Sequence, residues 1–326
     1  MVFNVKFEEE YIISDKGLKL FTCRWLPENQ EQKALVFLCH GYAMESSISM
    51  KGTANRLANA GYGVYGIDYV GHGKSEGLHG YIPKFDDLIR DCADHFAKVC
   101  ERQENKGHKR FMLGESMGGA VVLLLHRKMP EFWNGVVLVA PMCKIAEELK
   151  PNELVIKVLE KLANVLPTWK IVPGQDIVDV AVRDPAKKEE VRSNPYWYTD
   201  RPRLRTASEL LNASMGLEDR LNEVTVPFII VHGGDDKVTD PSISKMLYDT
   251  ALSTDKTFKL YPGMWHALTY GELPENINIV FKDIIEWLDE RSPRNSMILE
   301  QERKSKEDID ANIQKRVSLQ CQSESG

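Results

Sequence analysis

Residues 110–128 constrain the fold more than any other stretch of the sequence. A short apolar run ends at Gly114, a helix-forming run begins at Ala120, and residues 114–118 between them read G-x-S-x-G with Ser116 at the centre. A turn this sharp strains the backbone of the serine and requires very small residues two positions before and after it. We therefore expect a strand, a turn and a helix here, with the Ser116 hydroxyl held clear of the sheet near the positive end of the helix.

Strand and helix signals alternate on both sides of this turn. Apolar runs predict buried parallel strands at residues 34–39, 63–68, 133–140 and 226–232, a further strand at 257–261, and an antiparallel hairpin at 5–26. Helices are expected at about 52–60 and 85–104, from residue 241, and at about 275–291. The alternation is typical of an α/β fold with a mostly parallel central sheet and helices on both faces.

The alternation stops between residues 144 and 222. An apolar-rich helical run at 154–166 ends at Pro167, and aromatic residues gather at 196–198. We interpret 144–222 as a helical cap inserted between two parts of the core, residues 1–143 and 223–291. Two questions stay open: whether the apolar run meets lipid or packs on the core, and whether the aromatic cluster lines a pocket or anchors the cap. The charged residues 292–326 predict a disordered tail.

Composition excludes several classes of function. The formal net charge of −6 argues against a nucleic-acid partner. The six cysteines show neither C-x-x-C pairs nor zinc spacing, and no phosphate-binding loop stands out, so we expect neither a metal nor a cofactor. Without a visible secretory signal or membrane-spanning run, we expect a cytoplasmic protein. Peripheral membrane contact through the cap stays open, and the sequence predicts no oligomeric state.

A serine hydroxyl needs a base to become a nucleophile, and the base needs an orienting carboxylate. Two loops at the carboxyl ends of predicted strands supply candidates downstream of the serine. We assign His266 as the base and Asp236 as its partner: their separation of 30 residues fits one helix plus one strand, and Asp236 precedes the apolar Val238, which would dock back into the core. Asp235 is the alternative partner. Asp240 is expected to cap the helix that begins after it.

Acyl transfer to Ser116 would create an oxyanion, which needs two fixed hydrogen-bond donors. One candidate is the backbone N–H of Met117, directly after the serine. The other is the N–H of Tyr42, in the loop that follows the predicted strand at 34–39.

Four polar side chains near these motifs are expected to have structural roles. His40 and His72 would shape their loops, and His232 would satisfy a strand end. Glu115 precedes the serine, so its side chain should point away from the hydroxyl and form a structural hydrogen bond or salt bridge.

Six motifs together resemble the plant monoacylglycerol lipase-like group of α/β-hydrolases, which includes lysophospholipase-like proteins and caffeoylshikimate esterases. The motifs are residues 40–45, 68–77, 114–119, 140–142, 232–240 and 261–266. The resemblance runs from about residue 8 to 291 and implies the triad Ser116, Asp236 and His266, the oxyanion donors Tyr42 and Met117, and a helical cap. The family often has a small residue where Tyr42 stands, so this side chain is expected to narrow the acyl side. The charged tail is a second departure from the family.

We therefore predict a serine carboxylester hydrolase that works through an acyl-enzyme on a small-molecule ester, either a monoacylglycerol or a lysophospholipid. Two alternatives use the same triad: a hydroxycinnamoyl esterase of the caffeoylshikimate type, and an acyltransferase. A third is a ligand receptor derived from a hydrolase. Dehalogenases and epoxide hydrolases are disfavoured because they carry a carboxylate where Ser116 stands.

Overall fold

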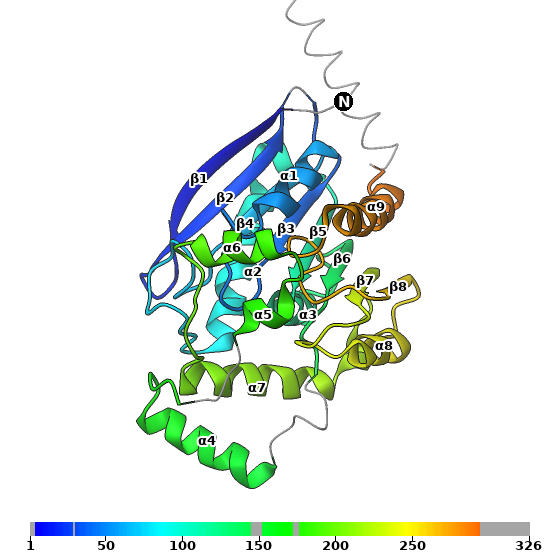
Figure 1. Cartoon of the computed structure of the whole chain (residues 1–326). Coiled ribbons are helices and arrows are strands. Elements are labelled where there is room, and N and C mark those ends of the chain that lie inside the picture. The colour runs from blue at the N-terminus through cyan, green and yellow to red at the C-terminus, as the bar shows by residue number, and fades with distance from the viewer. Residues whose placement is uncertain (1–3, 29, 145–151, 172–175, 294–326) are drawn as a thin grey trace, which may run out of the picture. The chain divides into compact units, whose positions relative to one another are not determined.

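The computed structural model describes residues 4–28, 30–144, 152–171 and 176–293. An eight-stranded sheet forms the core, in the order β1-β2-β4-β3-β5-β6-β7-β8 (Figure 1). β1 (Val5–Ile13) and β2 (Lys19–Pro27) form the expected antiparallel hairpin, and β2 pairs antiparallel with β4. The other strands run parallel: β3 (Leu35–Cys39), β4 (Gly63–Ile67), β5 (Arg110–Glu115), β6 (Gly135–Val139), β7 (Phe228–Gly233) and β8 (Lys256–Tyr261).

Helices cover both faces of this sheet. In β6, Val136 and Leu138 belong to one hydrophobic cluster, whereas Val137 and Val139 belong to a second, as the two-residue period of a strand requires. The first cluster includes side chains of α2 (Phe85–Glu101), α3 (Met117–Lys128) and α8 (Pro241–Thr250), and the second includes α1 (Lys51–Asn59) and α9 (Pro274–Arg291). Burial on both faces explains the continuous apolar strand sequences and confirms the predicted fold class.

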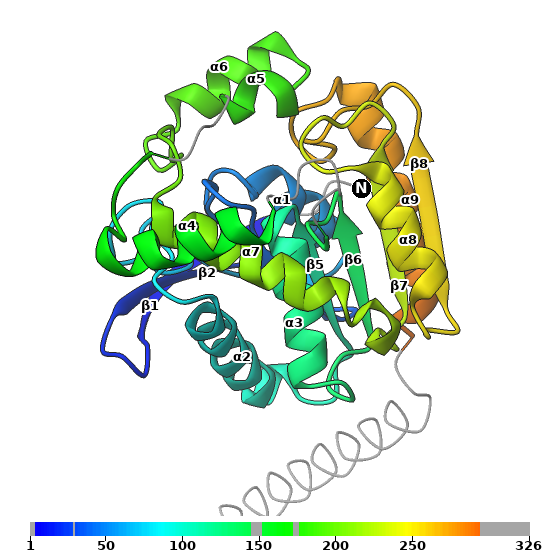
Figure 2. The same cartoon turned by 90° about the horizontal axis from the view of Figure 1, so that it is seen from below.

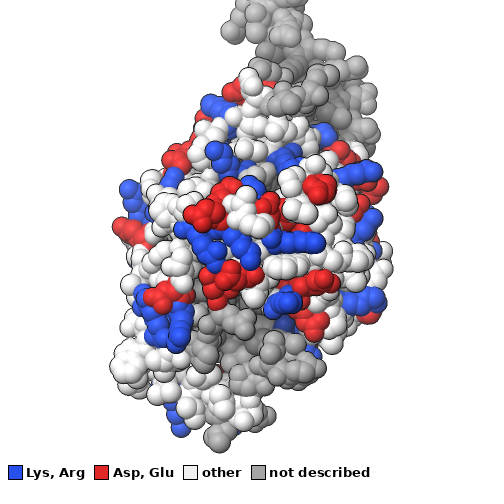
Figure 3. All heavy atoms as spheres, in the orientation of Figure 1, with Lys and Arg blue, Asp and Glu red and all other residues white. Residues whose placement is uncertain are grey.

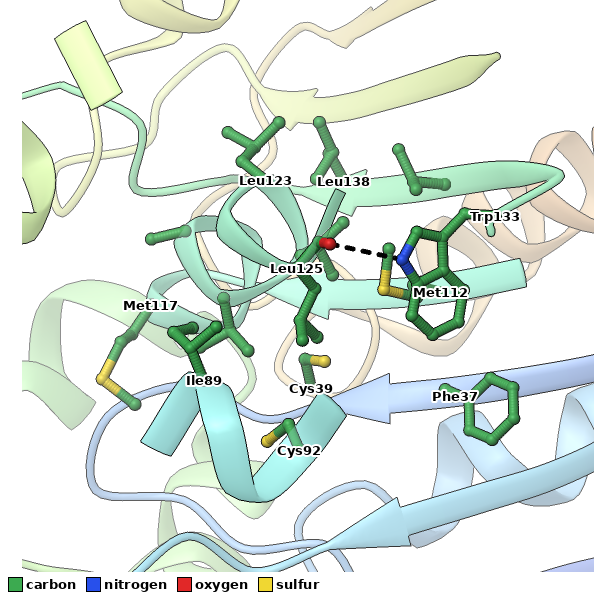
Figure 4. Close-up of a cluster of buried hydrophobic side chains, with 14 of the residues drawn as sticks. Phe37, Cys39, Ile89, Cys92, Met112, Met117, Leu123, Leu125, Trp133 and Leu138 are labelled. Atoms are coloured by element: carbon green, nitrogen blue, oxygen red, sulfur yellow. Dashed lines mark hydrogen bonds between the residues drawn. The ribbon is translucent and has the colours of Figure 1, made fainter. Parts of the chain in front are cut away.

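The packing beneath α3 fixes the start of that helix, where Ser116 lies. Figure 4 shows part of the first cluster, with Phe37 and Met112 from neighbouring strands close to Trp133. Trp133 meets Phe37 edge-on with ring centroids 5.7 Å apart, and its indole N–H donates a hydrogen bond to the backbone oxygen of Leu125 at 3.4 Å. The ring is thus buried with its only polar group paired, which holds α3 firmly on the sheet.

Four helices of the described chain lie between β6 and β7, where the sequence predicts the cap. They are α4 (Glu153–Val165), α5 (Ile177–Ala181), α6 (Pro185–Ser193) and α7 (Leu204–Glu218). α4 packs against α7, which in turn packs against α2 and α3 (Figures 1 and 2). The interpretation of residues 144–222 as an inserted cap fits this arrangement and stays a prediction. Residues 145–151 and 172–175 lie outside the described chain.

Charges of both signs are interspersed over the surface that carries α5 and α6 (Figure 3). On that surface Arg192 pairs with Asp176 at 3.0 Å and with Asp179 at 2.8 Å. Among the described residues, every helix is too short or too polar to cross a membrane. The predicted tail, apart from its first two residues, lies outside the described chain.

Candidate active site

Ser116 occupies the sharp turn that the sequence predicts. Its φ of 55° and ψ of −120° are strained for a residue with a side chain. Its backbone N–H donates to the backbone oxygen of Val139 at 3.0 Å, and its backbone carbonyl oxygen accepts from the N–H of Met142 at 2.9 Å. A Cβ atom on Gly118 would lie 1.9 Å from the oxygen of Cys39, so only glycine fits there.

His266 and Asp236 are hydrogen-bonded to each other. His266 Nδ1 lies 2.7 Å from Asp236 Oδ2, and both side chains are buried. A carboxylate can only accept, so Nδ1 carries the proton and Nε2 is left as an acceptor. The alternative carboxylate, Asp235, is exposed, and no described hydrogen bond joins it to His266. The predicted helix cap is confirmed, because Asp240 Oδ1 accepts from the N–H of Ser242 at 2.8 Å.

The Asp236 carboxylate has further partners that the sequence reasoning missed: the N–H groups of Val238 and Thr239 donate to Oδ1, at 2.7 Å and 3.0 Å, and two side chains lie on Oδ2. His232 Nε2 lies 3.0 Å from Oδ2, and the Thr239 hydroxyl donates to the same oxygen at 2.9 Å. His232 does lie at the end of β7, but the group that it satisfies is this carboxylate. Burial alone would raise the pKa of Asp236, yet the hydrogen bonds from His232 and His266 outweigh burial and hold the pKa well below its usual range. Asp236 therefore stays ionised at neutral pH.

The candidate residues follow strands of one parallel array. Ser116 follows β5, Asp236 follows β7 and His266 follows β8, so their loops meet at the carboxyl edge of the sheet. Glu115 links the first loop to the last, because its Oε2 accepts a hydrogen bond from the Thr269 hydroxyl at 2.8 Å. This contact confirms the structural hydrogen bond expected for Glu115.

The two candidate oxyanion donors come from segments that lie next to the serine. Met117 is the first residue of α3, so its N–H has no acceptor within the helix. Gly41, just before Tyr42, lies so close to the serine that an added Cβ would be 3.4 Å from Ser116 Cβ. The Tyr42 hydroxyl donates to the oxygen of Gly80 at 3.0 Å, which fixes the ring.

His40 and His72 have the structural roles expected of them. His40 Nδ1 lies 2.8 Å from the oxygen of Gly41, and Nε2 accepts from the N–H of Tyr69 at 3.2 Å. His72 Nδ1 lies 3.1 Å from the oxygen of Val70. Burial lowers the pKa of His40 to about 4 and that of His72 to about 3, so both rings are neutral at physiological pH.

A cavity of about 650 Å³ opens beside Tyr42, which is a size typical of small-molecule sites. Its other lining residues are Ala43 and residues 176–178, 192 and 197–202. Trp197 and Tyr198 are buried in its wall, and the N–H of Tyr198 donates to the oxygen of Ala43 at 3.0 Å. Trp197 and Tyr198 of the aromatic cluster therefore line this cavity, and Tyr198 also joins the helical segment to the Tyr42 loop.

The same helical segment is attached to the loop that carries His266, residues 262–273. The N–H of Ala267 donates to the oxygen of Ala181 at 3.0 Å, and the N–H of Asp184 donates to the oxygen of Gly271 at 3.0 Å. The segment thus contacts both the Tyr42 loop and the His266 loop.

Comparison with known proteins agrees with this architecture. Residues 30–273 match the model of the Hydrolase_4 family, described as serine aminopeptidase, S33. Caffeoylshikimate esterase of Arabidopsis thaliana is 36% identical over 88% of this chain and 86% of its own, and human monoglyceride lipase is 31% identical over 86% of this chain and 90% of its own.

A solved structure extends the comparison to three dimensions. The crystal structure of a soluble variant of monoglyceride lipase from Saccharomyces cerevisiae, in complex with a substrate analog, has a TM-score of 0.79 and 25% identity, and the match covers 90% of this chain and 98% of that one. Sheet, site geometry and sequence matches converge on one conclusion. The chain belongs to the Hydrolase_4 family of α/β-hydrolases, in the group of caffeoylshikimate esterase and the monoglyceride lipases, and is a carboxylic ester hydrolase.

Proposed function

We propose that Ser116, Asp236 and His266 form the catalytic triad of this hydrolase. Ser116 attacks the ester carbonyl, while His266 Nε2 takes the serine proton and passes it to the leaving alcohol. Water, activated by the same ring, then hydrolyses the acyl-enzyme. The strongest support is the 2.7 Å hydrogen bond between His266 and the buried Asp236, at the sheet edge where the Ser116 turn also lies.

The backbone N–H groups of Tyr42 and Met117 complete the proposal as the oxyanion hole. Each such donor is worth about 3 kcal/mol of transition-state stabilisation in hydrolases. Met117 adds the positive end of α3, and Tyr42 is held in place through its hydroxyl.

We propose monoacylglycerol or lysophospholipid esters as the substrates. Several matched relatives are monoglyceride lipases. The cavity beside Tyr42 combines apolar side chains, such as Ile177 and Val178, with the charged Arg192 and Asp176. Such a lining suits an acyl chain joined to a polar alcohol.

A second candidate substrate is a hydroxycinnamoyl ester. The relative with 36% identity is a caffeoylshikimate esterase, and Tyr42, Trp197 and Tyr198 offer aromatic surfaces to a planar acyl group. Two other functions would use the same triad. An acyltransferase would pass the acyl group from Ser116 to an acceptor alcohol instead of water. A ligand receptor would use the triad only for slow cleavage of its ligand.

The triad is tested by labelling the protein with a fluorophosphonate and mapping the modified peptide. We expect the label on Ser116, with no label and no turnover in Ser116→Ala; label on another residue contradicts the proposal. A turnover panel of monoacylglycerols, lysophospholipids and caffeoyl esters then ranks the substrates. Measuring the products formed with and without an acceptor alcohol separates hydrolysis from acyl transfer. Sustained turnover would contradict the receptor function.

We further propose that α4 makes peripheral contact with membranes, in a cytoplasmic protein. Val155, Val158 and Val165 on this helix are exposed, and so is Trp169 after it. Exposed apolar side chains on one helix suit a lipid surface.

Val158→Glu should reduce co-sedimentation with phosphatidylcholine vesicles, whereas Leu260→Glu, which changes an exposed leucine on β8, should not. Equal sedimentation of Val158→Glu and wild type contradicts this part of the proposal.

A further inference from the structure

Glu115 is a buried carboxylic acid that the proposed triad does not use. It is the last residue of β5, where it pairs with Val139 of β6, and it is 1% exposed. A carboxylate in such a place is costly unless something compensates its charge. A glutamine would satisfy the same space without that cost, so the acid calls for an explanation beyond packing.

The described polar contacts of the Glu115 side chain lead to the loop that carries His266. Oε2 accepts from the Thr269 hydroxyl at 2.8 Å, while Oε1 is buried without a hydrogen-bond partner among the described residues. The titratable groups that face it are His266 and Tyr270, both from that loop. None of the described Lys or Arg side chains forms an ion pair with it. The charge of Glu115 therefore has one cationic partner in reach, the His266 ring when that ring is protonated.

Thr269 is held rigidly to His266 through the backbone of the loop. The N–H of Leu268 donates to the oxygen of His266 at 2.9 Å, and the N–H of Gly271 donates to the oxygen of Ala267 at 2.8 Å. A displacement of Thr269 would therefore displace the His266 ring.

We propose that Glu115 is a positioning residue for His266: its hydrogen bond to Thr269 holds the loop, and its negative charge stabilises the imidazolium that forms when His266 takes the proton of Ser116. The inference rests on the proposed triad. Asp236 acts on the ring through a direct hydrogen bond, whereas Glu115 acts through Thr269 and through its charge.

The ionisation of Glu115 gives this role a pH dependence. Burial raises the pKa of Glu115 to about 7, and the Thr269 hydrogen bond and the nearby His266 limit that rise. Above this pH the side chain is charged and supports the imidazolium. Below it, the side chain is neutral and the support is lost.

The test compares wild type with Glu115→Gln as a function of pH, using kcat and KM for one ester. Above about pH 8 the variant should lose about tenfold in kcat, which is the effect of one pKa unit on the base, with little change in KM. Below about pH 6 the two proteins should converge, because wild-type Glu115 is then neutral as well. A purely structural role would give a ratio that does not change with pH.

Two further variants separate the hydrogen bond from the charge. Thr269→Ser keeps the hydroxyl and should keep the wild-type pH profile. Thr269→Val removes the hydroxyl, so Glu115 becomes harder to ionise, and the fall of kcat on the acid side of its pH profile should move to higher pH. Asp91→Asn is the matched control, because Asp91 on α2 is a half-buried carboxylic acid whose pKa burial raises to about 6, and its profile should match wild type.

The outcomes are distinct from those of the triad test. If Ser116 takes the fluorophosphonate label but Glu115→Gln matches wild type at every pH, or differs by a constant factor, the inference on Glu115 is overturned and the triad stands. If the label falls elsewhere, the triad itself fails. Should Glu115→Gln fold poorly, the Thr269→Val and Thr269→Ser pair decides, since equal profiles for those two overturn the inference.

Discussion

The loops that carry the proposed triad and the helical segment between β6 and β7 differ in how exposed their polar contacts are. At the sheet edge, Asp236, His266 and Glu115 form buried hydrogen bonds within loops anchored to parallel strands. The helical segment has buried contacts as well, such as the bond from the Asn194 amide to Glu45 Oε1 at 3.2 Å, but α5 and α6 also carry exposed ion pairs, such as Arg192 with Asp179. Buried hydrogen bonds fix geometry, whereas exposed ion pairs contribute little to stability. We therefore expect the loops of the proposed triad to be the more rigid region, and the ion-paired face of α5 and α6 to adjust more readily to different substrates.

The largest expected effect separates the two adjacent aspartates at the sheet edge. Asp236→Asn should lower kcat by about 10⁴-fold, because an amide would leave the His266 ring in the wrong tautomer. Asp235→Asn, which changes the exposed neighbour, should stay within about twofold of wild type. Steady-state kinetics of both variants measure the contrast, and a larger loss for Asp235→Asn would transfer the role to that residue.

A second prediction tests the rigidity of the Ser116 turn. Gly118→Ala places a Cβ 1.9 Å from the oxygen of Cys39 and should destabilise the fold by about 3 kcal/mol or more. Gly52→Ala on α1 meets no atom within 4 Å and should stabilise the protein by up to about 1 kcal/mol. Urea unfolding measures both. Equal free energies of unfolding would mean that the turn is not tightly packed.

A third prediction concerns the stability cost of Glu115. Its pKa is raised in the folded protein, so folding takes up a proton and stability falls as pH rises from about 4.5 to 7. Glu115→Gln should therefore be more stable than wild type by about 3 kcal/mol at pH 8, and the difference should vanish near pH 4.5. Unfolding midpoints across this range check the sign. A variant that is less stable at pH 8 would show that the charge is compensated.

The smallest expected effect lies in the helical segment. Arg192 lines the cavity beside Tyr42 but is exposed, so Arg192→Gln should leave the unfolding midpoint unchanged. It should change the KM of one ester class relative to another by about threefold. Lys187→Gln, on the same helix but outside this cavity, should change neither. A large drop in stability for Arg192→Gln would remove the contrast between the two regions.

The sequence was most informative where burial leaves a simple pattern. The runs that became β3, β4, β6 and β7 are apolar because both faces of the sheet are covered, so strand positions could be predicted to within about two residues. The pairing of Asp236 with His266 followed from their positions after neighbouring strands.

Contacts that depend on three-dimensional packing left no such pattern. Thr269 and Glu115 are 154 residues apart, and no sequence motif predicts that their side chains are in contact. His232 was placed correctly at a strand end, but its partner there, Asp236, depends on how the following turn folds back. The place of Trp197 and Tyr198 in the cavity wall, and the bond from Tyr198 to Ala43, likewise emerged only from the folded chain.

The two attachments of the helical segment have a consequence for how substrate size should affect the reaction. Tyr198 is bonded to the Tyr42 loop, and Ala181 to the His266 loop, so a ligand that fills the cavity beside Tyr42 would act on a segment joined to both loops of the proposed site. Binding energy from remote parts of a substrate can then be used to align the reacting groups. Esters with shortened acyl chains should accordingly react more slowly even at saturation, rather than merely bind more weakly.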